Sequence, residues 1–482
     1  MAVSVADVKY RKSMQVLDGG ANGGRKSQVE VVSGARHALF PRVTKTERVN
    51  GVTRYRKQFW CNENADDDVA YGVLQWLENV SNGGDRFYLK KGTQTDTQAN
   101  ITSPPAGAFP LFTGAGRLSA PLTGGETEVA IEMEADDFAF ESGGYLHIAD
   151  KIKAGQTMAA GVVAGDSVQI TGGTWNKITS TTDIKYPKGI YLGGNEVLTV
   201  EPETNEEWLV IATIETADEV IGAGDGASAS PALSTLANTS TGIHRAEGKL
   251  PVITTLDGSD ATMTAYIRPD GTVDPVASDA TAGELDMDTG EWVADIAWTS
   301  TPKNGADILA TYCENPFDYS GNVVTIQLDD QVANPYAVAN TVASGCVYAD
   351  EVRAEIDSFE TSSVSGTYND TSYPAEPHNS GAEEDQITIT MTSATVCSIA
   401  GANLGPLGSG FSIASDCTPT DPTSGQPLFT LRAAGWGGTW AAGNTITFHL
   451  HPSAQGIWLK EVVPAGTEQE PNNLIVLGWY SE

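Results

Sequence analysis

The sequence predicts an all-β, multidomain fold of Ig-like sandwiches or small barrels, with an extended N-terminal arm. Short segments with alternating apolar and polar side chains recur along the chain, and this alternation is the period of a pleated strand. The composition has 51 Gly and 23 Pro but only 19% charged residues, which is typical of strands and turns rather than of helical bundles. At about 150 residues per domain, 482 residues indicate roughly three domains.

The first clear strands lie in the N-terminal quarter of the chain. RYRKQFWC at residues 54–61 alternates so that Phe59 and Trp60 face opposite sides, as in a strand. Residues 85–91 follow the turn SNGG and form the next predicted strand. Residues 66–80 contain glycine and β-branched side chains, which disfavour a helix. We therefore expect a strand flanked by loops there as well.

Changes in composition and strand spacing divide the chain into six segments. Short strands recur closely after about residue 116, and small polar residues dominate the stretch before residue 243, as in a linker or an exposed loop. The predicted segments are an extended basic arm at 1–35, a β-sandwich part at 36–115, an inserted β domain at 116–221, a linker-like loop at 222–242, a β-meander domain at 243–330 and a C-terminal β-sandwich at 331–482. Packing of the last segment against 36–115 is left open.

Charge is distributed unevenly along the chain. The net charge is −34, which disfavours general binding to nucleic acids or to anionic membranes. Residues 1–60 nevertheless carry +8, and the remaining residues carry −42. A basic arm can dock onto an acidic surface, including that of a neighbouring copy, although a solvated tail is the alternative. The assembly-contact candidates are Lys9, Arg11, Lys12, Arg25, Lys26, Arg54, Arg56 and Lys57.

The sequence favours a protein that folds in the cytoplasm. No apolar run approaches the about 18–20 residues of a membrane-spanning helix. The first residues, MAVSVADVKYRKSMQ, have no apolar core of the kind found in a secretory signal. Five scattered cysteines without a CxxC spacing indicate reduced thiols rather than disulfides. We expect no membrane partner.

Motifs for catalysis or cofactor binding are weak. Residues 286–291 resemble half of a calcium loop, but Ala297 stands where the bidentate Glu is needed, so a hairpin turn is favoured. Residues 165–167, Gly-Asp-Ser, match the nucleophile block of one esterase family but lack the strand-to-helix turn that a nucleophile needs. We therefore expect no enzymatic activity, no catalytic residues and no cofactor.

Two aromatic pairs near the C-terminus could bind a ligand. His449 and His451 share one face of a predicted strand, and two histidines can begin a zinc site. No third ligand is visible at a suitable spacing, so we expect a surface or interface pair without a metal. Trp436 and Trp440 lie in the glycine-rich stretch AAGWGGTWAAGN. They can stack on a sugar, cap a core or contact a protein, and they are the candidates for carbohydrate contact.

Three stretches carry a family resemblance. Residues 17–68 contain a DGG.N.GR segment followed by VSG, LFP.V and ER..G..RYRK.F. Residues 93–102 (TQTDTQANIT) and 449–466 (HLHPSAQGIWLKEVVPAG) are the other two. Together they resemble a family of virion structural proteins of tailed bacteriophages. The hairpin within 283–314 is similar to one that is common in phage tail and baseplate proteins.

The resemblance implies a non-catalytic structural component of a tailed bacteriophage particle. It would join subunits at the neck, collar, tail or baseplate, or decorate the head, as part of the virion after folding in the host bacterial cytoplasm. Its partners would be portal or neck, tail or capsid subunits and further copies of itself, with no nucleic acid. The alternatives are a carbohydrate-binding receptor-binding or adhesin-type tail protein, and a polysaccharide-cleaving enzyme with paired carboxylates.

Overall fold

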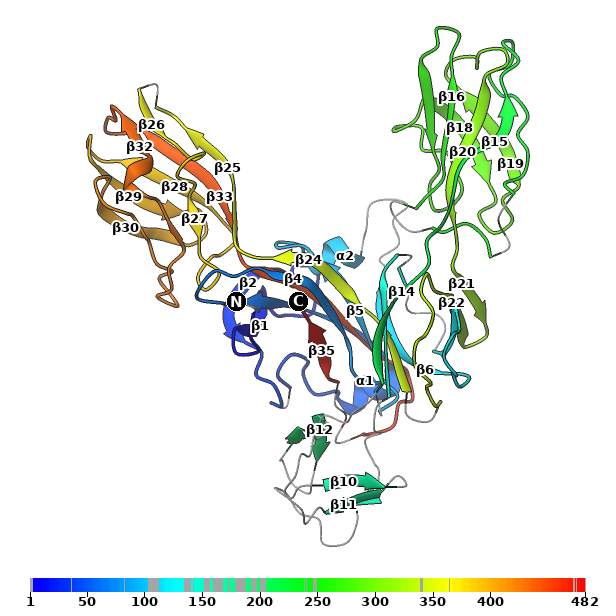
Figure 1. Cartoon of the computed structure of the whole chain (residues 1–482), viewed down its shortest axis with the longest axis horizontal. Helices are drawn as coiled ribbons and strands as arrows, with labels where there is room; N and C mark the ends of the chain where they lie inside the picture. The colour runs from blue at the N-terminus through cyan, green and yellow to red at the C-terminus, as the bar shows by residue number, and fades with distance from the viewer. Residues whose placement is uncertain are drawn as a thin grey trace.

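The computed structural model consists almost entirely of β-strands arranged in several sheets (Figure 1). It describes residues 3–481 except 36, 82, 103–111, 134–139, 142, 238, 240, 246–248, 339–340, 364, 471–472 and 474; within 151–204 it describes only five strands. The described helices are α1 (Lys45–Asn50), α2 (Gln98–Thr102) and a 3-10 turn, η1 (Ala433–Gly435). No described sheet closes into a barrel. The prediction of an all-β, multidomain fold is confirmed.

The central body is built on one large antiparallel sheet. Its strands in spatial order are β14 (Glu206–Val210), β8 (Tyr145–Asp150), β23 (Thr341–Gly345), β6 (Thr113–Leu118), β5 (Arg86–Gly92), β34 (Ala454–Val463), β3 (Val52–Asn62), β1 (Val8–Gln15) and β2 (Gly23–Glu30). A branch from β6 adds β7 (Glu128–Glu132), β22 (Val323–Gln327) and β21 (Phe317–Ser320). A second sheet contains β24 (Val347–Val352), β4 (Ala70–Leu77) and β35 (Leu477–Tyr480).

The strands β3 and β34 form the core of the body because both of their faces are covered. Trp60 and Ile457 pack on one face against residues of β4 and β24. Trp458 packs on the other face with Tyr88 and with Ile101 of α2. Adjacent residues of a strand point to opposite faces, so neighbouring side chains contribute to two different cores. In a strand that is buried on both faces, apolar side chains or side chains with a paired charge occupy nearly every position.

A first lobe, residues 214–314, projects from the body (Figure 1). Its main sheet has the order β15 (Ile214–Ala223), β20 (Asp307–Glu314), β16 (Val252–Leu256) and β17 (Thr262–Tyr266), and the hairpin β18 (Ala280–Leu285) with β19 (Trp292–Trp298) lies beside it. Residues 222–242, which were predicted to form a linker-like loop, are part of this lobe, because Leu236 belongs to its apolar core. The predicted boundaries of the meander domain, 243–330, are wrong because β15 pairs with β20, whereas β21 and β22 belong to the body.

A second lobe, residues 355–451, has its own apolar core. Its main sheet has the order β25 (Glu355–Thr361), β33 (Thr445–His451), β28 (Asp385–Met391), β29 (Val396–Gly401) and β30 (Gly405–Ser412). Two short pairs join it, β26 (Gly366–Tyr368) with β32 (Trp436–Gly438) and β27 (Glu376–Pro377) with β31 (Phe429–Thr430). The segment 331–482 is therefore divided between this lobe and the body.

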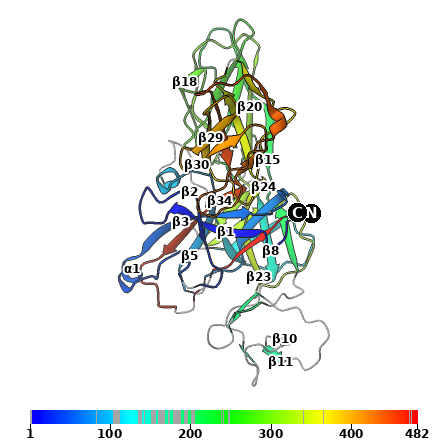
Figure 2. The same cartoon turned by 90° about the vertical axis from the view of Figure 1, so that its left-hand side faces the viewer.

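Each lobe is an insertion whose two ends lie side by side. The first lobe begins and ends on paired strands, with Ile214 opposite Glu314. The second does the same, with Glu355 opposite His451. Both lobes extend from the same side of the body, and the two chain termini lie close together (Figures 1 and 2). The body is therefore completed only when segments from both ends of the chain meet.

The strands of the predicted inserted domain at 116–221 are shared among the body, the first lobe, which contains β15, and a further group. β7, β8 and β14 extend the large sheet of the body. Within 151–204 the described strands are β9 (Thr157–Met158), β10 (Val168–Thr171), β11 (Thr174–Lys177), β12 (Lys188–Tyr191) and β13 (Val197–Thr199).

No helix in the described part of the chain has the length and apolar character that crossing a membrane requires.

The predicted extended arm at 1–35 is instead part of the central sheet. β1 pairs with β3 from Val8 to Lys12, and β2 pairs with β1. Val8 joins the apolar core of the body, and Ser13 and Lys26 are buried. The expectation of an extended arm separate from the body is corrected here, because the backbone groups of β1 hydrogen-bond to a strand of the same chain. Local charge and glycine content cannot reveal such pairing.

The isolated protein should therefore resist trypsin near its N-terminus. Cleavage after Arg11, Arg25 and Lys26 is expected to be at least about tenfold slower than cleavage after the exposed Arg245 and Arg432, because paired strands must open before a protease can bind them. Mass spectrometry of timed digests measures both rates in one sample. Equal rates at the two sets of sites would show that residues 8–30 are unpaired in the free protein.

Candidate functional site

The basic residues expected as assembly contacts bind acidic groups of their own chain. The guanidinium of Arg11 binds Glu63, with 2.8 Å between Nη2 and Oε2. Arg54, which is buried, binds Glu461 at 3.1 Å and also contacts Glu47. These pairs connect β1 and β3 with neighbouring segments of the body. They hold the sheet together and leave little of these cations for a partner.

Glu47, one of these acidic groups, lies in the first turn of helix α1 and takes part in the N-terminal cap of the helix. Thr44 and Glu47 form a capping box, in which each side chain accepts a hydrogen bond from the other residue's backbone N–H. Hydrogen bonding from Thr44, together with Arg54, lowers the pKa of Glu47 to about 2. The carboxylate of Glu47 is therefore charged at neutral pH where it meets Arg54. The motif around Glu47 in the family resemblance thus has a structural role in this chain.

Lys26 connects the N-terminal strands with the second lobe. Its ammonium lies 3.2 Å from Glu383 and donates to the backbone oxygen of Ala382. Burial disfavours the charge of Lys26, but the surrounding negative groups, of which Glu383 is the strongest, together raise the pKa of Lys26. Gln28 also donates to Glu383. A basic segment does dock on acidic residues, but those residues belong to the same chain.

The remaining basic candidates differ in burial. Arg56 is buried and binds the exposed Asp18 at 2.7 Å. The half-buried candidates are Lys9, Lys12 and Arg25. Arg25 lies 3.4 Å from the backbone oxygen of Glu384 in the second lobe. Of these residues, Arg25 contacts the second lobe and Arg56 is paired within the body.

Lys57 is the most deeply buried of these cations. Its ammonium lies 2.5 Å from the carboxylate of Asp96 and donates to the backbone oxygens of Gly24 and Asp96. The rings of Phe59 and Trp458 lie 4.8 and 5.9 Å from it. Burial lowers the pKa of Lys57, and the carboxylate of Asp96 opposes that shift. Four distant segments are thereby held around one charge.

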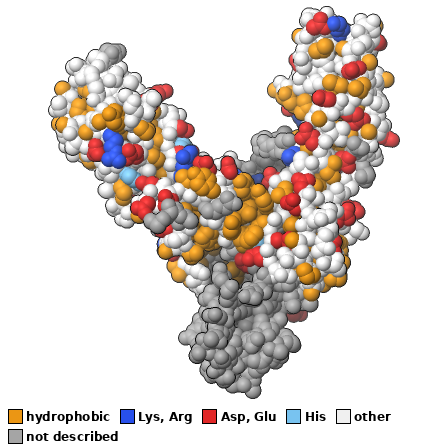
Figure 3. Space-filling view, in the orientation of Figure 1, with side chains coloured by type: hydrophobic (Ala, Val, Ile, Leu, Met, Phe, Trp, Pro, Cys, Tyr) orange, Lys and Arg blue, Asp and Glu red, His pale blue; other side chains and the backbone are white. Residues whose placement is uncertain are grey.

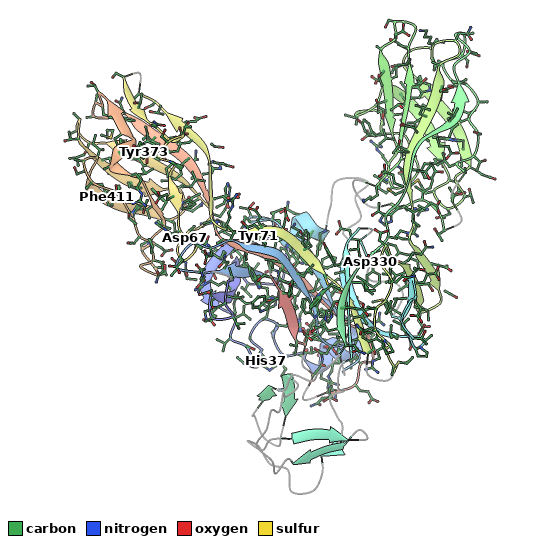
Figure 4. The ribbon with its side chains drawn as sticks, viewed as in Figure 1. His37, Asp67, Tyr71, Asp330, Tyr373 and Phe411 are labelled. Atoms are coloured by element: carbon green, nitrogen blue, oxygen red, sulfur yellow. The ribbon has the colours of Figure 1, made fainter. Side chains whose placement is uncertain are left out.

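A second connection to the second lobe comes from the loop after β3. Asp67, labelled in Figure 4 where the body meets that lobe, lies 2.7 Å from Nδ1 of His378. It also accepts the backbone N–H of Asn379 at 2.7 Å. Asp67 stands in the run Asp66-Asp67-Asp68, whose local pattern does not distinguish a solvated loop from a structural contact. Only the tertiary structure shows that Asp67 joins the body to the second lobe.

An aromatic groove of about 470 Å³ lies where the two sheets of the body meet. It is lined by side chains of β4, β8, β14, β24 and β35, chiefly Tyr71, Tyr145, Trp208, Tyr348, Asp350 and Tyr480. Tyr71 is 48% exposed and Tyr480 is 39% exposed. Hydrophobic side chains gather on this part of the body, between the bases of the two lobes (Figures 3 and 4).

The rings behind the groove support one another. Trp208 lies 5.0 Å from Tyr480 between ring centroids, and Tyr145 lies 5.2 Å from Tyr348. His147 Nε2 lies 2.7 Å from a carboxylate oxygen of Glu206 on the paired strand β14. Ring contacts of this kind fix side-chain positions before a ligand arrives. The groove can therefore bind a flat apolar group while Asp350 accepts a hydrogen bond at its edge.

None of the residues predicted from the sequence as contacts lies in the groove. The predicted strand within 66–80 contains Tyr71, but its sequence pattern does not separate Tyr71 from the other aromatic residues. The exposed position of Tyr71 on a strand whose later residues are buried is a weak local signal. Its neighbours Trp208 and Tyr480 come from segments that are far away in the sequence. Only sheet pairing brings these rings together.

The two tryptophans proposed for carbohydrate contact belong to the core of the second lobe. Trp440 is 3% exposed, and a side chain at Gly366 would come within 2.4 Å of its ring. Trp436 is half-buried, with its ring centroid 5.3 Å from that of Trp440. Stacking on a sugar requires an exposed ring face, which Trp440 does not offer. Among the uses considered, the structure corresponds to a core-capping loop.

The weak motifs of the sequence have simple structural explanations where they are described. Asp286 accepts backbone hydrogen bonds from Asp288 at 2.9 Å and Thr289 at 3.2 Å, which is an Asx turn. This turn accounts for the apparent half of a calcium loop. The Gly-Asp-Ser block at 165–167 lies outside the described residues.

A comparison of the chain with family models, with curated proteins and with solved structures found no match. Two structural features of the described residues provide evidence about the function of this chain. One is the cluster around Lys57, and the other is the aromatic groove of the body.

Removing the partner of Lys57 should destabilise the body. Asp96→Asn leaves a buried cation without its carboxylate, and we expect a loss of about 3–5 kcal/mol in the free energy of opening β3 and β34. The control Asp18→Asn removes the exposed partner of the buried Arg56 and should cost less than about 1 kcal/mol. Hydrogen exchange of the β3 and β34 amides measures both. Similar losses in the two variants would contradict a special role of the Lys57 cluster.

Proposed function

We propose that this chain is a non-catalytic structural component of a tailed bacteriophage particle, where it joins neighbouring subunits. The observation that carries the proposal is that the three stretches with the family resemblance contribute to one buried cluster. Lys57 comes from 17–68, Asp96 from 93–102 and Trp458 from 449–466. Residues that form the framework of a fold are the ones that a structural family shares.

The architecture supports this proposal because the framework and the lobes are separate. The resembling stretches lie mainly in the central body, whereas the lobes at 214–314 and 355–451 are inserted between its strands. Each lobe has its own apolar core. A joining protein needs a rigid centre and several surfaces for different neighbours, and this arrangement provides both.

The aromatic groove is the proposed contact with a neighbouring subunit of the particle. Exposed tyrosines on a rigid base are typical of the anchors that dominate the energy of protein interfaces. Tyr71 and Tyr480 are such residues. Asp350 at the edge of the groove and the net charge of −34 favour a neighbour whose contacting surface is apolar with basic groups around it.

Mass spectrometry of gradient-purified particles tests this function. We expect peptides of this chain in tailed particles at a fixed ratio to the portal subunit. The double variant Tyr71→Ala and Tyr480→Ala should fold but be incorporated at least about tenfold less, as expected for the loss of interface anchors. Tyr373→Ala removes an exposed tyrosine from the second lobe and should be incorporated normally.

Two results would contradict the proposal at different levels. Absence of the chain from purified particles would exclude a role as a virion component. Normal incorporation of the Tyr71 and Tyr480 double variant would keep the structural role but move the contact away from the groove. The position of the chain at the neck, the tail or the head surface follows from cross-links to identified subunits.

Carbohydrate binding in the same groove is the second candidate function. The groove offers exposed aromatic rings beside a carboxylate, Asp350, and this is the combination that stacks on a sugar ring and accepts its hydroxyl hydrogen bonds. Such binding would suit a receptor-binding or adhesin-type tail protein. It would use Tyr71 and Tyr480 instead of the two tryptophans of the second lobe.

A glycan array probed with the purified chain tests this alternative. Carbohydrate binding predicts specific signals that fall at least about tenfold in Tyr71→Ala and in Asp350→Asn, because each removes one of the few groups that orient a ligand. The control Tyr373→Ala should retain them. An array without signals above background, or signals that survive both groove variants, would exclude sugar binding in this groove.

A further inference from the structure

We propose that Asp357, His449 and His451 form a binding site for a divalent transition-metal ion, with zinc as the expected ion. One donor atom from each of these residues lies within 4.8 Å of the other two. Two imidazoles and one carboxylate are a ligand set that zinc binds in proteins. The site lies on the second lobe, away from the aromatic groove, and is independent of the function proposed above.

The sheet register supplies the third ligand that the sequence did not reveal. His449 and His451 lie on one face of β33 because they are two residues apart. Asp357 of β25 is the residue directly opposite His449 across the antiparallel pair. It is separated from both histidines by about ninety positions in the sequence. Spacing along the sequence could not reveal Asp357 as a third ligand, because this residue lies on a different strand.

One distance within the cluster already matches tetrahedral coordination. His451 Nε2 lies 3.3 Å from Asp357 Oδ2. Zinc bonds of about 2.0–2.1 Å at a tetrahedral angle place neighbouring ligand atoms about 3.3 Å apart. This edge of the site is therefore already formed. His449 is exposed, so rotation of its side chain can bring its nitrogen to the third position, and water can occupy the fourth.

Glu384 prepares His451 for metal binding. Its Oε2 lies 2.9 Å from His451 Nδ1. A histidine that donates from one ring nitrogen to a carboxylate presents the lone pair of the other nitrogen to a metal, and such partners orient metal ligands in many proteins. The nitrogen left for the metal is Nε2, which faces Asp357. Asp357 and Glu384 together also balance the double positive charge of the ion.

An ion bound at this site would stabilise the second lobe at the point where the lobe joins the body. β25 begins three residues after β24 ends, and β33 ends three residues before β34 begins. β24 and β34 are strands of the body. An ion bound by Asp357, His449 and His451 would therefore link the two strands through which the lobe is attached. Binding to the folded state alone would also raise the melting temperature of this lobe.

Calorimetric titration of the full chain with zinc chloride tests the site. We expect one high-affinity ion per chain, with a dissociation constant in the micromolar range or below. Asp357→Asn and His449→Ala should each weaken this affinity at least about 100-fold, and Glu384→Gln should weaken it by about 10–100-fold, as found for residues that orient metal ligands. His37→Ala, an exposed histidine outside the cluster, should leave the affinity unchanged.

Cobalt provides a second readout that does not depend on stability. The cobalt-loaded chain should show the visible absorption of a tetrahedral site, and Asp357→Asn should lose it while retaining the circular dichroism of the parent. Failure of the parent to bind zinc would show that His451 only pairs with its two carboxylates. Zinc affinity unchanged in both ligand variants would place the ion elsewhere and overturn the proposal.

Discussion

The buried ammonium of Lys57 is the constraint on which the central body depends. A charge inside a protein is tolerated only when it is paired and hydrogen-bonded, so Asp96 and the carbonyl of Gly24 must lie beside it. Gly23 also has to be glycine, because its φ is +105° and a side chain would come within 2.6 Å of Trp458. The N-terminal segment is consequently fixed in the sheet. Its positive charges stabilise the fold through ion pairs with acidic residues of the same chain.

Both lobes are inserted between strands of the central body, whose framework is the pairing of β3 with β34. The chain enters and leaves each lobe through one antiparallel strand pair, so the lobe can carry an independent core without interrupting the pairing of β3 with β34. That pairing places Gln58 opposite Ile457 and joins the two ends of the chain. Such distant pairing makes folding slow because loop closure has to precede it.

The features that we assign to binding are found where separate segments meet. The groove lies between two sheets, and the cluster of Asp357 and the two histidines lies between two strands at the base of a lobe. In both places paired strands hold the backbone, with a shift in register directly after Asp357 at the histidine cluster. A protein built in this way presents preorganised surfaces at its joints, which suits a role in holding other molecules.

Local pattern determined the strands, since the alternation at 54–61 is a property of neighbouring residues. The shared face of His449 and His451 follows from the same period of two. The tertiary structure alone decided which strands pair, and therefore that Asp357 meets those histidines and that Asp96 meets Lys57. It also decided where the lobes begin and that Trp440 is buried. The reason is that register between distant strands depends on long-range packing, which local periodicity does not specify.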